Sequence, residues 1–484
     1  MPRSLPDKHL EEDEVAVGPV TSNEPPAESA RVVDHIAERQ LCRKFDVQLM
    51  PVLAIMYLFN ALDKGNIGNA QTNGLSKDLG FPEERYNLLV SIFFVPYVVF
   101  APPVAMIGKR FGPARVLPVL MFTFGTMTLC SAAATNFGGI FALRFFLGMA
   151  ESGFFPLVIY YLTTFYRRGE LARRLALFYA ASNIANAFSG LLAFGVFHIK
   201  SHIESWRYLF IIEGAASVLF SMFAFWYLPR DAASARFLGA EEKALAYHRM
   251  VVDSSSIVSE NTPTTYCFLM IEICLGVPIQ SVALFMPQII QRLGYSTVKT
   301  NLYTVAPNVG GAVMLLILAF SSDFFRIRFP FIMLGFTLTF IGFIIYAAIT
   351  DVQAQIQVAY FATFMMVWGT SAPSVLLSTW YNNNIAHEGR RVVLTSVGVP
   401  LANVMGLASS NIFLAKEKPK YETALITTAV FGAAGATVAG LLGTYMVFDN
   451  HRRNRKAGVK TTARDVPTHK LRDGPSAPEF RWFL

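Results

Sequence analysis

The sequence predicts an all-α membrane protein with twelve transmembrane helices in two six-helix bundles. Of its 484 residues, 53% are hydrophobic and only 15% are charged, whereas about 25% of the residues in a soluble domain are charged. The core of a soluble chain of this length cannot hold this number of apolar side chains. Lipid is therefore the expected solvent. The spacing of the apolar runs and a repeat between the two halves of the chain define the bundles.

Residues 1–47 are predicted to form a cytosolic N-terminal tail that ends in a short amphipathic helix. Residues 1–30 are polar and rich in Pro, Glu and Ser, and they lack the apolar segment of a cleaved signal peptide. A disordered tail is expected there. Residues 31–46, RVVDHIAERQLCRKFD, are predicted to form a helix that lies on the membrane surface.

Twelve apolar runs follow, and each has about the 20 residues, or more, that a spanning helix needs. The N-terminal bundle, 48–228, is predicted to contain helices at 48–66, 86–107, 116–135, 138–163, 173–198 and 206–228. A polar cytosolic loop, 229–265, separates it from the C-terminal bundle, 266–448. The helices predicted there are 266–290, 299–321, 328–350, 356–381, 391–415 and 421–448. Residues 449–484 form a basic cytosolic tail in this prediction.

The distribution of Lys and Arg predicts the orientation in the membrane. With a cytosolic N-terminus, the loops on the cytosolic side hold about twice as many basic residues as the loops on the other side. Both termini are therefore expected in the cytosol. The basic residues lie in short clusters between apolar runs, so they indicate membrane topology rather than nucleic-acid binding.

The two halves of the chain contain matching loops. IGKRFGPARVLP, residues 107–118, joins the second and third predicted helices. SSDFFRIRFPFI, residues 321–332, joins the second and third helices of the second half. Both loops are short and basic and lead into a proline. Such an internal repeat is typical of a secondary transporter that is built from two bundles.

A few charged residues interrupt the apolar runs. Insertion of one charged side chain at the centre of a bilayer costs at least about 2.5 kcal/mol. In LRFFLGMAESGFFP, residues 143–156, Arg144 and Glu151 are seven positions apart and share one face of a helix. Asp63 and Lys64 stand near the predicted outer end of the first helix. We expect an ion pair between Asp63 and Arg144, which serves either proton coupling or structure alone.

Glu151 lies deeper and has no partner close by in the sequence. A carboxyl group in apolar surroundings can hold a proton near neutral pH. Lys64 offers a positive charge to an anion, although as a point charge it holds a carboxylate less firmly than the planar fork of Arg.

Other polar residues have two possible roles. Asn183, Asn403 and Tyr97 are candidates for the wall of a substrate cavity, but bonding to a neighbouring helix or packing in the core explains them equally well or better. Glu272, two turns into the seventh predicted helix, either faces the cavity or lies at a helix interface. Glu213 is expected to tie its helix to a neighbour or a loop.

The sequence contains no His/Cys metal cluster, nucleophile elbow or phosphate-binding loop. The four cysteines have no spacing that indicates zinc or a disulfide framework. Neither an enzyme nor a cofactor is expected.

Several stretches together resemble the major facilitator superfamily, and within it the fungal allantoate-permease-like branch of the anion:cation symporters. They cover most of residues 40–484 and are LDKGNIGNAQTNGLSKDLG, YNLLVSIFFVPYVVFAPP, GKRFGPARVLP, LRFFLGMAESGFFPLVIYYLTTFYRRGE, WRYLFIIEG, ARFL, YNNNIAHEGRR and GPSAPEFRWFL. The combination of the first-helix and fourth-helix motifs is highly specific.

The resemblance implies the major facilitator fold and roles for individual residues. The acids at Asp63 and Glu151 are expected to carry coupling protons, and Arg144 to pair with Asp63. Lys64 is expected to bind the substrate carboxylate, with Asn403 as a further substrate contact. The implied function is proton-coupled symport of a small organic anion (a carboxylate, ureide or vitamin-like molecule) by alternating access. A monomer in the plasma membrane is expected.

The chain departs from the family pattern at three places. The usual Asp-Arg-Ser-Asn reads Asp-Lys-Gly-Asn at 63–66, which weakens the expectation of strict carboxylate selectivity. Lys109 stands where many members of the wider superfamily carry Asp, whereas the second half keeps Asp323. The stretch 250–265 is shorter than expected and lacks an amphipathic segment, as a trimmed gene model would.

Two other functions remain open from the sequence. One is export of a fungal secondary metabolite, with the gene beside a biosynthetic cluster. The other is a nutrient sensor that keeps the fold without transporting.

Overall fold

The computed structural model describes residues 35–484 except 83, 167, 200–201, 254–262, 386–387, 418–419, 459–460, 464–474 and 476. Within these residues the regular secondary structure is helical, without a strand, as the fold class predicts. The tail predicted over residues 1–30 lies outside the described residues.

The first half of the chain contains α1 to α9. Their bounds are α1 His35–Gln48, α2 Met50–Thr72, α3 Leu75–Asp78, α4 Glu84–Phe111, α5 Pro113–Ser131, α6 Phe137–Glu151, α7 Phe154–Thr163, α8 Arg168–Val196 and α9 Ser205–Tyr227. In this half α5 packs on α9, α4 on α6, and α2 on α8.

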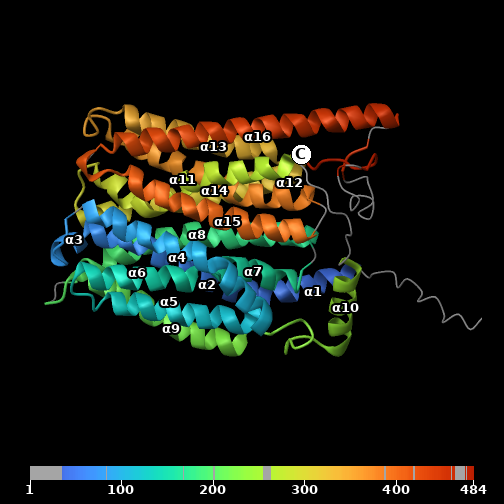
Figure 1. The fold of residues 1–484 in the computed structure, drawn as a ribbon, viewed down its shortest axis with the longest axis horizontal. Helices are drawn as coiled ribbons and strands as arrows, with labels where there is room; N and C mark the ends of the chain where they lie inside the picture. Colours follow the sequence, from blue (N-terminus) through green and yellow to red (C-terminus); the bar gives the residue numbers. More distant parts are fainter. Residues whose placement is uncertain are drawn as a thin grey trace, which may run out of the picture.

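The second half contains α10 to α16. Their bounds are α10 Ala240–Asp253, α11 Pro263–Gln291, α12 Thr297–Phe325, α13 Phe329–Ala348, α14 Ile356–Asn384, α15 Glu388–Ile412 and α16 Glu422–Ala457, with a short 3₁₀ turn at Ala415–Glu417. The long helices run side by side along one axis (Figure 1). We name the two ends of this bundle after the elements that lie there: the α3 end, and the α1 end, where α10 and the C-terminal residues also lie (Figure 1).

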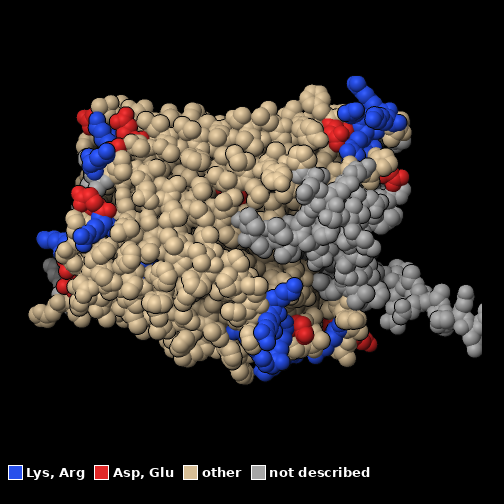
Figure 2. Space-filling view, in the orientation of Figure 1, with Lys and Arg blue, Asp and Glu red and all other residues tan. Residues whose placement is uncertain are grey.

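The surface of the bundle matches a membrane. Ten segments of the described chain are long and apolar enough to span a bilayer, and α8 and α15 lie at the two remaining predicted spans. On the face shown in Figure 2, most Lys, Arg, Asp and Glu gather at the two ends, and the belt between them shows few charged side chains. Large apolar side chains such as Leu219 and Val430 are exposed on the candidate spans because lipid, not water, is their solvent.

The first spanning helix is longer than predicted. The sequence places its end near residue 66, but α2 continues to Thr72. Asn69 donates to Ser189 of α8 at 2.7 Å, and Ser189 donates to Asn66 at 2.9 Å. These bonds satisfy polar groups that otherwise oppose the burial of the last turns. Asp63 and Lys64 therefore lie in the interior of the helix rather than at its end.

The fourth predicted span is divided into α6 and α7 at Ser152 and Gly153. Pro156 has no N–H to donate to the carbonyl group of Ser152, which interrupts the helical hydrogen bonds. Gly153 allows α4 to come close, because a Cβ there would lie 2.2 Å from Cγ1 of Val104. The break follows directly after Glu151.

Two shorter helices cover the α1 end of the first half. The amphipathic helix predicted at 31–46 is α1, whose Phe45 is fully buried against Phe165 and Tyr166. Lys44 of α1 pairs with Glu242 of α10 at 2.5 Å, and this pairing lowers the pKa of Glu242. The segment predicted as a polar loop thus contains a helix of its own, α10, whose Ala246 is buried.

The last residues of the chain are docked against the second half. Trp482 is 3% exposed and donates its indole N–H to Asp449 of α16 at 2.8 Å. The backbone of Phe483 exchanges two hydrogen bonds of 2.8 Å with the side chain of Asn384 at the end of α14. Residues 477–484 therefore connect the α1 ends of α14 and α16.

Several small and polar residues join the two halves at the α3 end, beside aromatic contacts such as that of Tyr86 with Phe285. Asn87 of α4 donates to the carbonyl oxygen of Phe413 at 2.6 Å, and the hydroxyl groups of Ser91 and Ser410 lie 2.6 Å apart. Gly190 of α8 lies so close to α12 that a Cβ there would be 2.2 Å from Oγ1 of Thr304. These contacts close the bundle at the α3 end.

Candidate functional site

Five ionisable side chains gather inside the first half, a group we call the charge cluster. It consists of Asp63 and Lys64 on α2, Arg144 and Glu151 on α6, and Glu213 on α9. Asp63 is 1% exposed and Glu151 is 0% exposed. Buried charges are costly unless they are paired, so the pairing within the cluster decides what it can do.

Lys64 and Glu151 form an ion pair that the sequence did not predict. The ammonium nitrogen lies 3.6 Å from Oε2 of Glu151, and the Lys64 side chain is 20% exposed. The same nitrogen lies 4.7 Å from the centre of the Tyr97 ring and 5.8 Å from that of Phe93. Lys64 thus has its cation between a buried carboxylate and an aromatic wall, with one side accessible.

The ion pair predicted between Asp63 and Arg144 is not formed. The guanidinium of Arg144 instead donates to the backbone oxygen of Asp63 at 3.5 Å, and both carboxylate oxygens of Asp63 are buried without a hydrogen bond. Successive residues of a helix point about 100° apart. Because Lys64 faces Glu151, Asp63 presents its backbone rather than its carboxylate to Arg144.

Glu213 adds a third acid to the cluster. Its side chain is 2% exposed, neither of its oxygens has a hydrogen-bond partner, and Asp63 and Arg144 lie within electrostatic reach. Among the described residues, Glu213 makes no hydrogen bond that ties it to a loop or a neighbour. Three acids thus stand against two cations, so the cluster is electrically neutral when it holds one proton.

The predicted residues Asn403 and Asn183 make hydrogen bonds outside the charge cluster. Gln280 of α11 donates to Oδ1 of Asn403 on α15 at 2.9 Å. Asn183 of α8 accepts a hydrogen bond of 3.2 Å from Ser371 of α14, which links the two halves. Gln280 is not among the residues predicted from the sequence, although it is the one amide in the apolar run GVPIQSVALF.

Glu272 lies away from these hydrogen bonds. It is 4% exposed and packs near α15, where a Cβ on Gly398 would lie 3.4 Å from its Cγ. It precedes Gln280 by eight residues of α11, which is about 12 Å along the helix axis. The structure therefore does not bring Glu272 together with Lys64 or Asn403.

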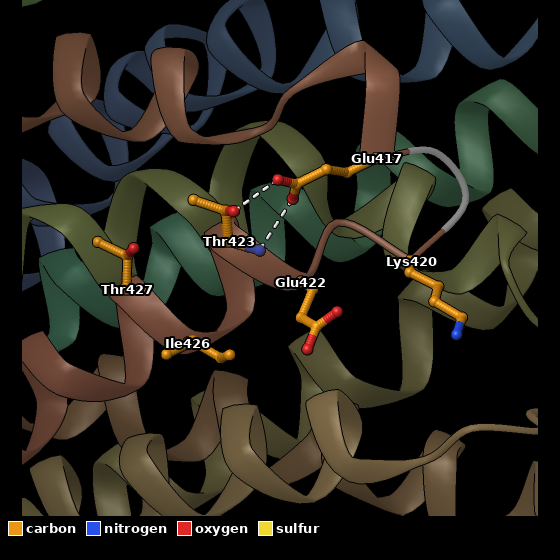
Figure 3. A pocket seen from close by; sticks show the side chains of 6 residues that line it. All are labelled: Glu417, Lys420, Glu422, Thr423, Ile426 and Thr427. Carbon is orange, nitrogen blue, oxygen red and sulfur yellow. Dashed lines mark hydrogen bonds between the residues drawn. The ribbon is translucent and has the colours of Figure 1, made fainter.

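A surface pocket of about 520 Å³ opens at the start of α16 and is lined by Glu417, Lys420, Glu422, Thr423, Ile426 and Thr427. Glu417 accepts hydrogen bonds from the backbone N–H and the hydroxyl group of Thr423, at 2.9 and 2.5 Å (Figure 3). These bonds cap α16, and the pocket shares no residue with the charge cluster.

Comparison with known proteins identifies the family. Residues 53–386 match the family model described as the Major Facilitator Superfamily. The chain belongs to this superfamily. It is therefore a multi-pass membrane transporter, and the superfamily is not a class of enzymes.

Relatives and solved structures agree with this assignment. An uncharacterized transporter of Schizosaccharomyces pombe is 52% identical over 465 residues, which cover 94% of this chain and 92% of the relative. The high-affinity nicotinic acid transporter of Saccharomyces cerevisiae is 29% identical, over 82% of this chain and 76% of the relative. The fold is similar to that of the xylose transporter from E. coli in a partially occluded inward-open conformation, with a TM-score of 0.67, 14% identity, and coverage of 83% of this chain and 98% of that one.

Proposed function

We propose that this member of the superfamily is a proton-coupled symporter of a small organic anion, in the allantoate-permease-like branch of the anion:cation symporters. The observation that carries the proposal is the Lys64–Glu151 pair, in which an accessible cation is held by a fully buried acid. The proposed location is the plasma membrane, with the α1 end in the cytosol.

The pair couples a proton to an anion by competition. An anionic substrate and the Glu151 carboxylate both require the ammonium of Lys64. A proton on Glu151 neutralises this competitor and leaves the cation to the substrate. Proton and anion therefore favour each other's binding, and the coupling is the same in both directions.

Asp63 and Arg144 provide a second place where charge can rearrange. In the present conformation Arg144 contacts the backbone of Asp63, and the Asp63 carboxylate accepts no hydrogen bond from the described residues. We infer that Arg144 moves onto this carboxylate in another conformation of the cycle. A proton on Asp63 and an ion pair to Arg144 are then alternative ways to neutralise the same acid.

Alternating access follows from the closed α3 end. The hydrogen bonds that join the halves there, such as Ser91 to Ser410, are made between helices of different bundles. Rocking of one bundle against the other breaks them and exposes the interior from the opposite side. In this proposal the conformation described here, with its α3 end closed, is the one that is open toward the cytosol.

The relative from Saccharomyces cerevisiae supports an organic acid as the substrate. Its name assigns it nicotinic acid, which is a carboxylate at neutral pH. A single accessible lysine beside two aromatic rings suits a substrate of that size and charge.

The test is Glu151→Gln, which mimics the permanently protonated acid. Substrate counterflow in vesicles, which needs no net proton movement, is expected to continue, while uphill uptake driven by a pH gradient is lost. Glu422→Gln, which changes an exposed acid at the pocket of Figure 3, is the matched control and keeps both activities. Parallel loss or parallel retention of the two activities in Glu151→Gln contradicts the coupling role.

The pH dependence of substrate binding, measured beside counterflow, separates symport from the alternatives. In symport, acidification strengthens substrate binding to the wild-type protein, because the proton removes Glu151 from Lys64. An exporter that works by antiport shows the opposite dependence, since proton and substrate then compete. A sensor binds the substrate but shows no counterflow.

A further inference from the structure

The contact between α4 and α15 follows a regular antiparallel register. Asn87 bonds to Phe413, Ser91 to Ser410, and the ring of Phe94 lies against Gly406, where a Cβ would be 2.3 Å from Cζ. Each step of three or four residues along α4 thus matches a step of three or four residues back along α15.

The next step of this register places Tyr97 level with Asn403. Tyr97 is the ring that the Lys64 ammonium approaches to 4.7 Å, and Asn403 is the acceptor for Gln280 at 2.9 Å. The Lys64 cation and the Gln280 amide therefore lie beside two residues that stand at the same level on packed helices, whose axes are roughly 8–10 Å apart.

A second contact leads to the same placement. Gly65 and Gly68 of α2 pack on α11, where a Cβ at Gly68 would lie 2.6 Å from the carbonyl oxygen of Leu284 and one at Gly65 would lie 4.0 Å from that of Ala283. Lys64 directly precedes Gly65, and Gln280 lies one turn before Ala283. Two independent helix contacts thus bring Lys64 and Gln280 to within about one turn of the same level.

Gln280 has hydrogen-bonding capacity left for a ligand. A primary amide offers two donors and a carbonyl oxygen, and in the described part of the chain one of these, a single N–H, is used, in the bond to Asn403. The residue is 7% exposed within an otherwise apolar stretch of α11. A buried amide with unused groups is costly unless something binds them for part of the transport cycle.

We propose that Gln280 determines specificity by hydrogen-bonding the end of the substrate that lies opposite its carboxylate. The inference rests on the proposed function, because it takes Lys64 as the carboxylate site. The ring centres of Phe93 and Tyr97 lie 5.6 Å apart, and the two rings form an aromatic wall against which a flat ring packs well. The substrate class is accordingly a planar, single-ring carboxylate with a ring nitrogen or hydroxyl group on its far side.

The experiment compares ligand pairs that differ only at the far side. Dissociation constants are measured on the purified full-length protein for benzoate, pyridine-3-carboxylate and 3-hydroxybenzoate. The wild-type protein is expected to prefer each polar compound over benzoate by about threefold to tenfold, as one hydrogen bond to a neutral group provides. Equal affinities for all three compounds overturn the inference.

Three variants locate the preference. Gln280→Leu is expected to remove it, so that all three compounds bind with equal affinity, and the binding of benzoate shows that the variant is folded. Gln280→Glu lacks the N–H donors, so it loses the preference for the ring nitrogen but keeps the preference for the hydroxyl group. Each preference is a ratio of two dissociation constants, so it stays valid if the new charge weakens the binding of all three ligands. Gln288→Leu, which alters another glutamine of α11 that accepts from Tyr421, is the control and keeps the preference.

The outcomes distinguish the two proposals. Lys64→Ala is expected to weaken all three ligands alike. If it does so while Gln280→Leu retains the full preference, the role of Gln280 is wrong and the proposed carboxylate site stands. If Lys64→Ala changes none of the affinities, or the wild-type protein binds no carboxylate, the proposed function itself fails.

Discussion

Gly190 is the residue whose substitution tests alternating access most directly. It lies where α8 of the first half meets α12 of the second half at the α3 end. An alanine there would place its Cβ 2.2 Å from Oγ1 of Thr304 and 2.7 Å from the backbone oxygen of Asn301. Because the second neighbour is backbone, rotation of a side chain does not relieve the overlap, and the helices have to separate.

The size of the effect follows from this overlap. Adding a methyl group to a well-packed contact costs about 1–3 kcal/mol. The cost applies only while the α3 end is closed, so Gly190→Ala shifts the equilibrium toward the conformation that is open at this end. By the relation of about 1.4 kcal/mol per factor of ten, the shift is about fivefold to 150-fold.

The assay measures access to the contact between the two halves. Ser91→Cys is introduced into a variant without the four native cysteines, and a membrane-impermeant maleimide is added at the α3 end. Ser91 is 7% exposed in the closed form, so its labelling rate reports opening. Gly190→Ala is expected to raise this rate by the factor given above.

Gly195→Ala is the matched control. Gly195 lies on the same helix, but a Cβ there has no atom within 4 Å. The change in backbone flexibility is the same, and only the clash is missing. If both alanine variants label at the same rate as the parent, close approach at Gly190 does not hold the α3 end shut.

Three further predictions concern the charge cluster and the C-terminal segment. Asp63→Asn is expected to abolish proton-driven accumulation while the protein still reaches the membrane; continued accumulation against a gradient would make Asp63 structural. In transport assays Lys64→Ala should raise the substrate concentration needed for half-maximal uptake. Lys64→Arg should preserve or lower this concentration, because a guanidinium binds a carboxylate through two hydrogen bonds. An unchanged dose response in Lys64→Ala would show that the residue is not part of the binding site. Trp482→Ala removes a buried ring and its hydrogen bond to Asp449, and the loss of a large aromatic side chain costs about 3–5 kcal/mol of stability. Limited proteolysis should therefore cut residues 477–484 faster than in the wild-type protein. Equal cleavage rates would show that this ring does not hold the segment.

Much of the fold could be predicted from the sequence because lipid imposes simple rules on composition and helix length. The positions of the long helices follow from apolar runs, and the division into two halves from the polar segment between them. The end of α2 was predicted too early because Asn66 and Asn69 look like the end of an apolar run. Their partner, Ser189, belongs to a helix that is distant in the sequence, and no local pattern shows such a bond.

The candidate site was predictable in its residues but not in its pairing. Asp63, Lys64, Arg144 and Glu151 are conspicuous as charges within apolar runs. Which acid meets which base depends on the rotation of α2 relative to α6, and a sequence does not specify that rotation. The pair that forms, Lys64 with Glu151, therefore became visible only in the structure. Their roles in coupling and binding remain predictions.

The chemistry of the contacts at the α3 end affects how fast the protein can cycle. Hydroxyl and amide groups such as those of Ser91, Ser410 and Asn87 lose one partner when the halves part, but water entering the opening replaces it at once. An interface of large apolar side chains would instead expose surface to water, at about 25 cal/mol for each Å². Separation of these polar groups thus requires little net free energy. Contacts between polar groups are specific when the α3 end is closed, and their hydration costs little free energy when it opens. These properties suit a surface that forms and separates once in every turnover.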